Sequence, residues 1–182
     1  MYRRAAAFTL LLLSGCTSMN VTDFAAGTPE MRLESYFPGA AEAHGMFLDR
    51  FGNVRNQFSV AIHSEWDGKT LTMHEHFTYV GGAHGQLVDR VWHFHKAGDH
   101  RWIGTATDVI GEAHGRWSGN AFHMRYTVDL PVGKSRWRVQ FSDWLFRESP
   151  RVVLNHAVVS RFGITIGQVQ LAFRHQSAPP PS

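Results

Sequence analysis

The sequence has only one cysteine, Cys16, among its 182 residues. A disulfide within the chain is therefore excluded. No apolar run reaches the 18 or so residues that a membrane-spanning helix requires. The sequence also contains no G-x-S-x-G element, no Walker loop and no H-E-x-x-H pair, so it lacks the signatures of serine hydrolases, P-loop enzymes and zinc proteases. On this basis we predict no catalytic residue and no cofactor.

An excess of positive charge is also missing. The chain has 18 Lys and Arg against 15 Asp and Glu, a formal net charge of +3. Arg3 and Arg4 lie in a segment that we expect to be removed, which leaves 16 against 15, or +1. Binding to a nucleic-acid backbone needs a clustered basic face, so nucleic acid is not expected as a partner. The hydrophobic share of 43% suits one folded domain with one core.

Residues 1–15 have the features of a secretory signal. Arg3 and Arg4 supply the positive start, and residues 5–13 form a mostly apolar stretch. Nine helical residues cover about 14 Å, which is too short for a hydrocarbon core of about 30 Å. The adjoining Leu13-Ser14-Gly15-Cys16 resembles the bacterial lipobox, in which the cysteine receives a diacylglycerol and becomes the mature N-terminus. An ordinary signal peptide with an incidental cysteine is the alternative.

A lipid on Cys16 would attach the protein to a membrane, which is then a partner. By resemblance to Gram-negative lipoproteins, Thr17 in place of an aspartate favours the outer membrane, with the protein facing the periplasm. Residues 16–38 are polar and punctuated by Gly and Pro, which predicts a tether. The domain itself is expected over 39–176, followed by a disordered tail over 177–182 that contains three consecutive prolines.

Residues 39–176 show alternation of apolar and polar residues with a period of two, interrupted by turn dipeptides. We predict a mostly β fold of about nine or ten antiparallel strands, arranged as a single up-and-down, lipocalin-like barrel. One apolar inward face persists through every hairpin, and closure of a barrel removes exposed sheet edges. Barrels of this size can hold a small apolar ligand. A β-sandwich is the alternative.

The turn dipeptides also predict which residues lie opposite each other, because a two-residue hairpin loop fixes the register. The predicted pairs are Phe47 with Phe58 across Gly52-Asn53, Ile62 with Met73 across Asp67-Gly68, Met73 with Trp92 across 80–85, Trp92 with Ala106 across a loop at Gly98, and Gly111 with Val128 and Gly115 with Met124 across Gly119-Asn120. These pairings place the bulky apolar residues on one face.

Charged residues also fall on this inward face. Glu75 is predicted directly opposite Arg90. A three-residue loop at Gly98 adds Asp108 to the row, whereas a two-residue loop would turn that strand over. An unpaired buried carboxylate is costly or becomes protonated, so a pair with Arg90 is expected. Asp143 is a further candidate for the row, because its neighbours at alternate positions are apolar.

Two interpretations of this row remain open. It could be a polar anchor at the floor of a ligand pocket, or a closed salt-bridge network that fixes the barrel register. Two carboxylates around one guanidinium leave no net positive charge, so a hydroxyl, amide or neutral ester group fits better than a free carboxylate. The apolar side chains predicted to border the pocket are Phe58, Ile62, Met73, Phe77, Trp92 and Met124.

Four of the twelve histidines form a pattern on the outward face. They are His74 and His76 on one predicted strand and His93 and His95 on the next, with Asp89 opposite His76. Two imidazoles and a carboxylate could bind Zn²⁺. Because the spacing of a known zinc motif is missing, we interpret the histidines as solvated surface and predict no metal site.

Short motifs spread over nearly the whole chain carry a resemblance. They include Tyr36-Phe37, Trp66-Asp67-Gly68, Glu75-His76-Phe77, Arg90-Val91-Trp92, Gly104-Thr105-Ala106 and Ser160-Arg161-Phe162-Gly163. Together with the lipobox, they resemble a family of uncharacterised bacterial lipoproteins, domain of unknown function 3833. The resemblance implies a lipid anchor but no particular activity.

These observations predict a lipid-anchored outer-membrane protein whose barrel binds or shuttles an apolar ligand, such as an acyl lipid, in the periplasm. Two alternatives remain. A lipid-modifying enzyme would use Glu75 or Asp108 as acid or base, and would need one of them open to the cavity with a shifted pKa. A structural or assembly lipoprotein would have a filled core and use its outer surface.

Overall fold

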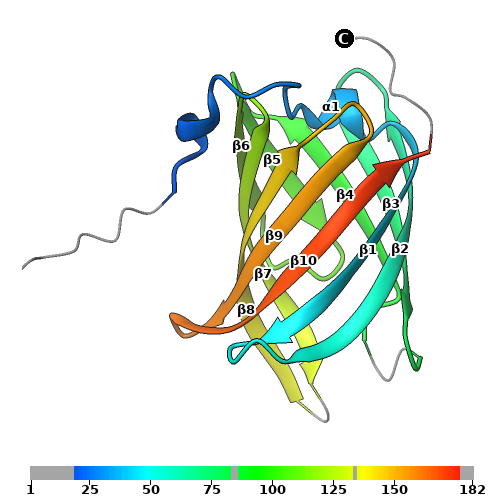
Figure 1. Ribbon diagram of the computed structural model, residues 1–182, viewed down its shortest axis with the longest axis vertical. Helices are drawn as coiled ribbons and strands as arrows, with labels where there is room; N and C mark the ends of the chain where they lie inside the picture. The colour runs from blue at the N-terminus through cyan, green and yellow to red at the C-terminus, as the bar shows by residue number, and fades with distance from the viewer. Residues whose placement is uncertain (1–18, 83–85, 133–134, 177–182) are drawn as a thin grey trace, which may run out of the picture.

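The computed structural model describes residues 19–82, 86–132 and 135–176, which form a closed barrel of antiparallel strands (Figure 1). The ten strands are β1 (Gly39–Asp49), β2 (Val54–Trp66), β3 (Thr70–Tyr79), β4 (Asp89–Lys96), β5 (Arg101–Ala106), β6 (Ala113–Ser118), β7 (Ala121–Val132), β8 (Ser135–Arg147), β9 (Val152–Arg161) and β10 (Ile164–His175). Each strand pairs with the next, and β10 pairs with β1. The predicted up-and-down barrel is therefore confirmed, and a sandwich is excluded.

Helical structure in the described residues is limited to two short segments, the 3-10 turn η1 (Val21–Phe24) and helix α1 (Leu33–Tyr36). Neither is long and apolar enough to cross a membrane. The predicted signal segment, Cys16 and the predicted tail lie outside the described residues.

The connections gather at the two ends of the barrel, because neighbouring strands run in opposite directions. Loops 67–69, 97–100, 119–120 and 148–151 lie at one end with α1, and we call this the capped end (Figure 1, top). The β1–β2, β3–β4, β5–β6, β7–β8 and β9–β10 connections lie at the other end, which we call the mouth.

Residues 31–37 close the capped end. Met31, Leu33, Tyr36 and Phe37 are all at most 2% exposed. The Tyr36 hydroxyl donates a hydrogen bond of 3.3 Å to the carbonyl oxygen of Phe173, which ties this segment to the wall. The sequence assigned these residues to the tether over 16–38, and the structure corrects that assignment for residues 31–37. Their apolar side chains gain more from burial than a solvated tether would allow.

Three of the five predicted hairpin registers are confirmed. Met73 lies opposite Trp92, and Trp92 lies opposite Ala106 across a three-residue loop. Gly115 lies opposite Met124. These pairings set large side chains against small ones, which allows the wall to curve.

Two other hairpins differ from the prediction by two residues each. Gly45, rather than Phe47, lies opposite Phe58. The Asp49 carboxylate accepts hydrogen bonds from loop N–H groups, and a bulge between Phe47 and Leu48 brings the offset to two residues. Ile62 lies opposite Glu75 rather than Met73. A slip of two residues keeps every side chain on its predicted face.

The second of these slips has a local cause. The Asp67 carboxylate accepts hydrogen bonds from the N–H groups of Lys69 and Thr70, both at 2.7 Å. The two loop residues are therefore Gly68 and Lys69, and Gly68 has the positive φ of +93° that the first position of such a turn can require.

The β5–β6 connection also departs from the prediction. Gly111 was expected opposite Val128, but Val109 forms the bridge to Val128. Residues 107–112 form turns rather than a continuation of the strand, so the ladder between β6 and β7 begins at His114.

We predict that Gly115→Ala destabilises the barrel. A Cβ atom at this position would lie 2.3 Å from Cζ of Phe122, whose side chain is 1% exposed and cannot move aside freely. Overpacking of this kind costs about 1–3 kcal/mol. Denaturant titration should show that loss, and Phe122→Leu in the same chain should recover part of it. Unchanged stability of Gly115→Ala would contradict the tight approach of the two residues.

Candidate functional site

A cavity of about 660 Å³ lies inside the barrel. It extends from Leu33 and Phe37 at the capped end to Leu130 and Trp137 near the mouth. Its walls come from β1 to β4 and β7 to β10 and are mostly aliphatic and aromatic. The inward faces of β5 and β6 add no lining side chain, and they include Gly104 and Gly115, each of which is covered by a ring from a neighbouring strand.

Most of the apolar residues expected around the pocket do line it. They are Phe58, Met73, Phe77, Trp92 and Met124. Ile62 does not line the cavity. Its side chain also points inward and is 4% exposed, but it belongs to the core cluster near the capped end, which residues such as Leu33 fill.

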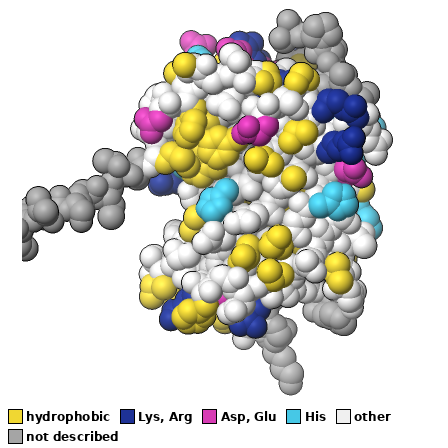
Figure 2. Space-filling view, viewed as in Figure 1, with side chains coloured by type: hydrophobic (Ala, Val, Ile, Leu, Met, Phe, Trp, Pro, Cys, Tyr) yellow, Lys and Arg dark blue, Asp and Glu magenta, His cyan; other side chains and the backbone are white. Residues whose placement is uncertain are grey.

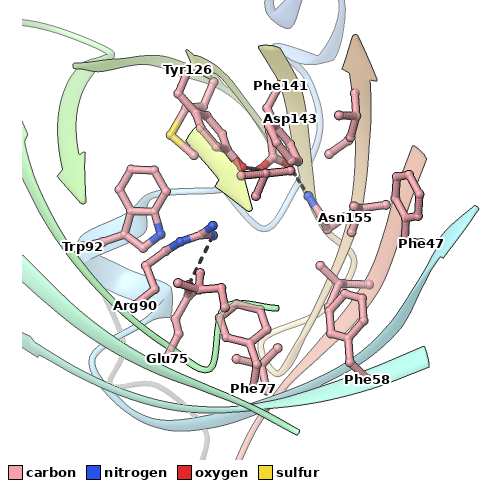
Figure 3. A pocket seen from close by; sticks show the side chains of 18 of the residues that line it. Phe47, Phe58, Glu75, Phe77, Arg90, Trp92, Tyr126, Phe141, Asp143 and Asn155 are labelled. Atoms are coloured by element: carbon pink, nitrogen blue, oxygen red, sulfur yellow. Dashed lines mark hydrogen bonds and ion pairs between the residues drawn. The ribbon is translucent and has the colours of Figure 1, made fainter. Parts of the chain in front are cut away.

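Arg90 extends into this cavity from β4 (Figure 3). Its Nε and Nη2 atoms donate to the two carboxylate oxygens of Asp108, at 3.0 and 2.5 Å. Its Nη1 atom lies 3.7 Å from Oε2 of Glu75, the residue directly opposite on β3. The three side chains are only 10–14% exposed. The structure thus brings together the predicted row, with Arg90 shared by two carboxylates.

Asp108 contributes to the site without lining the cavity. It follows β5 in the turn region that precedes β6, and the bidentate contact with Arg90 joins this turn to β4. Such paired, charge-assisted hydrogen bonds are the strong form of an Arg–carboxylate contact.

A second polar group faces Arg90 from the opposite wall (Figure 3). Asp143 on β8 accepts a hydrogen bond of 3.0 Å from the Tyr126 hydroxyl and another from the Asn155 side-chain amide. Asn155 also donates to the Trp144 carbonyl oxygen at 2.9 Å. Asp143 was predicted from the sequence, whereas the roles of Tyr126 and Asn155 were missed.

The alternation of β9 could have revealed Asn155. It shares the inward face with Val153, Ala157 and Val159, all of which are at most 2% exposed. A polar residue in the middle of such a series must find a partner inside the barrel. That partner is Asp143.

Burial raises the pKa of the Glu75 carboxyl to about 7, and the charges of Asp108 and Asp143 act in the same direction. The charge of Arg90 opposes this shift only in part. Burial also raises the pKa of Asp143 to about 6, against the hydrogen bonds from Asn155 and Tyr126. Burial acts to lower the pKa of Arg90, but Glu75 and Asp108 outweigh it, so Arg90 remains charged.

Arg90 is the one Lys or Arg among the described residues that line the cavity, and Asp108 already holds it. Glu75 and Asp143 are both protonated at pH values below about 6, and each can then donate as well as accept a hydrogen bond. No cationic group is left to neutralise a free carboxylate ligand among the described residues that line the cavity. Hydroxyl, amide and ester groups match the site better.

The outward histidines are arranged as predicted along β3 and β4. His76 Nδ1 lies 2.7 Å from Oδ1 of Asp89, and His93 Nδ1 lies 3.3 Å from the Thr72 hydroxyl. His74 lies opposite Val91, away from the His76–Asp89 pair. Within the described residues, no group of three or more His, Cys, Asp or Glu side chains could hold a metal ion.

We predict that Glu75→Gln changes the pH dependence of stability. The folded-state pKa of Glu75 lies above its unfolded value, so the folded protein binds this proton more tightly. Its contribution to the free energy of unfolding is present at low pH and is lost as pH rises from about 4.5 to about 7. At pH 5 the protonated acid resembles Gln. Between pH 5 and pH 8 the variant should gain on the order of 1–3 kcal/mol relative to wild type.

Urea titrations at several pH values measure this difference. The pKa of His123, which burial and then Arg125 lower to about 4, acts in the opposite direction over an overlapping range. It is common to both proteins and cancels in the comparison. Glu148→Gln, the same substitution at an exposed position after β8, is the matched control. A flat difference for Glu75→Gln would show that Glu75 is ionised throughout.

The chain was compared with solved structures, with curated proteins and with protein families. An S-type phycobiliprotein lyase, CPES, of Guillardia theta has a similar fold, with a TM-score of 0.55 and 7% identity over 81% of this chain and 94% of that chain. A second structure, EF1p2_mFAP2b bound to DFHBI, gives a TM-score of 0.43 and 10% identity over 85% of this chain and 99% of that one. No curated protein matches the sequence significantly. A family profile matches residues 10–175, and the chain belongs to the family described as "Protein of unknown function (DUF3833)".

Proposed function

We propose that the barrel binds one apolar small molecule that carries a neutral polar group. The observation that carries the proposal is the cavity of about 660 Å³, whose walls are mostly apolar and include a few polar side chains such as Glu75, Arg90 and Asp143. Small-molecule sites in proteins have this size and this combination of apolar walls with a few placed polar groups.

The polar end of the ligand is expected next to Glu75. Its Oε2 atom is buried in the cavity wall and has no hydrogen-bond partner among the described residues, since Arg90 Nη1 lies 3.7 Å away. A buried acceptor without a partner costs free energy, and a ligand donor recovers it where it reaches this carboxyl, whose side chain is 11% exposed. A hydroxyl or amide group of the ligand supplies such a donor. An acyl lipid with a neutral headgroup meets both requirements.

The alternatives are less well supported. A structural lipoprotein was expected to have a filled core, and the cavity differs from that expectation. An enzyme would need an acid or base open to the cavity. The raised pKa of Glu75 suits that role, but Asp108 is held by Arg90 outside the cavity lining. Similarity to the lyase at 7% identity supports the fold alone, so the proposal depends on the cavity.

The proposal also includes a cellular location. A lipid on Cys16 would hold the barrel at the outer membrane with its ligand site in the periplasm. The support for this part is the sequence, in which the lipobox-like Leu13-Ser14-Gly15-Cys16 follows a short positively charged signal.

The ligand prediction can be tested with the neutral apolar probe N-phenyl-1-naphthylamine. The full chain secreted without lipid, as the Cys16→Ser variant, should bind the probe and raise its fluorescence. Val159→Phe adds a ring to the cavity wall and should weaken binding by on the order of tenfold, or about 1.4 kcal/mol. Val158→Phe, on the outer side of the same strand, is the matched control and should bind normally. Equal binding by both variants would place the probe outside the barrel.

The lipid prediction has a separate test. Mass spectrometry of the full chain expressed in a bacterium should find the mature protein beginning at Cys16 and carrying added acyl mass. Cys16→Ser should lose that mass and should fractionate away from membranes. Wild-type protein that begins at another residue and carries no acyl group would contradict the lipid anchor and leave the cavity proposal unaffected.

A further inference from the structure

Exposed apolar side chains are concentrated at the mouth of the barrel. Nine large hydrophobic residues are exposed in the described part of the chain, and only Met19 and Leu154 lie elsewhere. The remaining seven, which we call the mouth rim, are Phe51, Val54, Val80, Ile110, Val132, Phe162 and Ile164. Figure 2 shows hydrophobic side chains beside Lys and Arg at this end of the molecule. Concentrated exposed apolar surface marks an interaction site.

Phe162 cannot be explained by the fold of its own hairpin. Arg161 pairs with Ile164, so Phe162 and Gly163 are the two loop residues. Their φ angles are +52° and +77°. Asn, Asp and Gly are preferred at such positions, and a bulky residue there is strained. Phe162 is also 86% exposed, so neither packing nor turn geometry accounts for an aromatic ring at this tip.

The β1–β2 loop presents a second aromatic tip. Phe51 is 74% exposed, and the guanidinium carbon of Arg50 lies 4.7 Å from the centre of its ring. Phe162 has the same kind of neighbour, because the guanidinium carbon of Arg161 lies 4.8 Å from its ring. Each tip therefore combines an exposed ring with an arginine.

These two arginines differ from others near the mouth. Arg55 forms an ion pair with Asp49 at 2.6 Å, and Arg136 forms one with Asp129 at 2.7 Å. Arg50 and Arg161 form no ion pair with a carboxylate in the described ranges. Arg50 is exposed, and Arg161 is partly exposed with its guanidinium carbon also 4.2 Å from the centre of the Trp137 ring, so no carboxylate of the described ranges neutralises either charge.

We infer that the mouth rim docks on a lipid surface that contains anionic headgroups. Aromatic rings favour the interface between headgroups and acyl chains, and basic side chains beside them attract anionic lipid. Val132 belongs both to the rim and to the cavity lining, so a lipid surface at the rim would adjoin the cavity. On the proposed function, the same contact lets an apolar ligand pass between membrane and cavity without crossing water.

Vesicle flotation tests the docking directly. The full chain carrying Cys16→Ser, which removes the expected lipid, is mixed with vesicles of phosphatidylcholine alone or with about 30% phosphatidylglycerol. We expect binding to the anionic vesicles. The double substitution Phe51→Ser and Phe162→Ser should reduce that binding by on the order of tenfold. Arg50→Gln with Arg161→Gln should remove the preference for phosphatidylglycerol. Leu154→Ser, on the outer wall of β9, is the matched control and should bind as the parent does.

Three outcomes would overturn the inference. They are the absence of binding to either vesicle, equal binding after the double Phe substitution, or a dimer in solution that the same substitution converts to monomers. The last result would identify a second copy of the chain as the partner. Binding of N-phenyl-1-naphthylamine without vesicles should be unchanged in the double Phe variant, so failure of docking is distinguishable from failure of the cavity proposal.

Discussion

The ion pair between Arg90 and Asp108 is the interaction on which the interior of this barrel depends. A guanidinium that is 14% exposed needs partners that replace its hydration, and the Asp108 carboxylate supplies them here. Because Asp108 takes both Nε and Nη2, Glu75 keeps only the longer contact at 3.7 Å, and Asp143 relies on neutral donors. Burial raises the pKa values of these two carboxyls, and the charge of Arg90 offsets that shift only in part. Because Arg90 is shared between Glu75 and Asp108, the cavity has little net charge.

The inward face of the barrel and part of its polar row could be predicted from the sequence. Side-chain alternation gave the inward face correctly even where the loops were misjudged, since both register slips were of two residues. The Glu75–Arg90 contact survived because it depends on the β3–β4 hairpin alone. Asn155 was overlooked because the β8–β9 register, which makes it a diagonal neighbour of Asp143, was not predicted. The closing role of Met31 and Tyr36 was missed because a short segment without periodicity carries no strand or helix signal.

The two ends of the barrel are built in opposite ways. At the capped end, apolar residues such as Met31 and Leu33 turn inward and are at most 2% exposed. At the mouth, Phe51 and Phe162 turn outward, although burial would favour them by about 1.5–3 kcal/mol each. A ligand that enters this cavity has its route through the mouth, because residues 31–37 occupy the other end. The exposed rings of Phe51 and Phe162 therefore lie at the end of the barrel through which a ligand would enter.

The position of Met19 limits how a lipid on Cys16 and the mouth rim could act together. Met19 and Arg125 line the same surface pocket, and Arg125 lies seven residues before Val132 on β7. Seven strand residues span about 23 Å, or about 18 Å along a barrel axis tilted by roughly 40° from the strands. The three residue steps from Cys16 to Met19 reach at most about 10 Å. A lipid-anchored chain must therefore tilt to bring its mouth onto the membrane that holds it, or present the mouth to a second lipid surface.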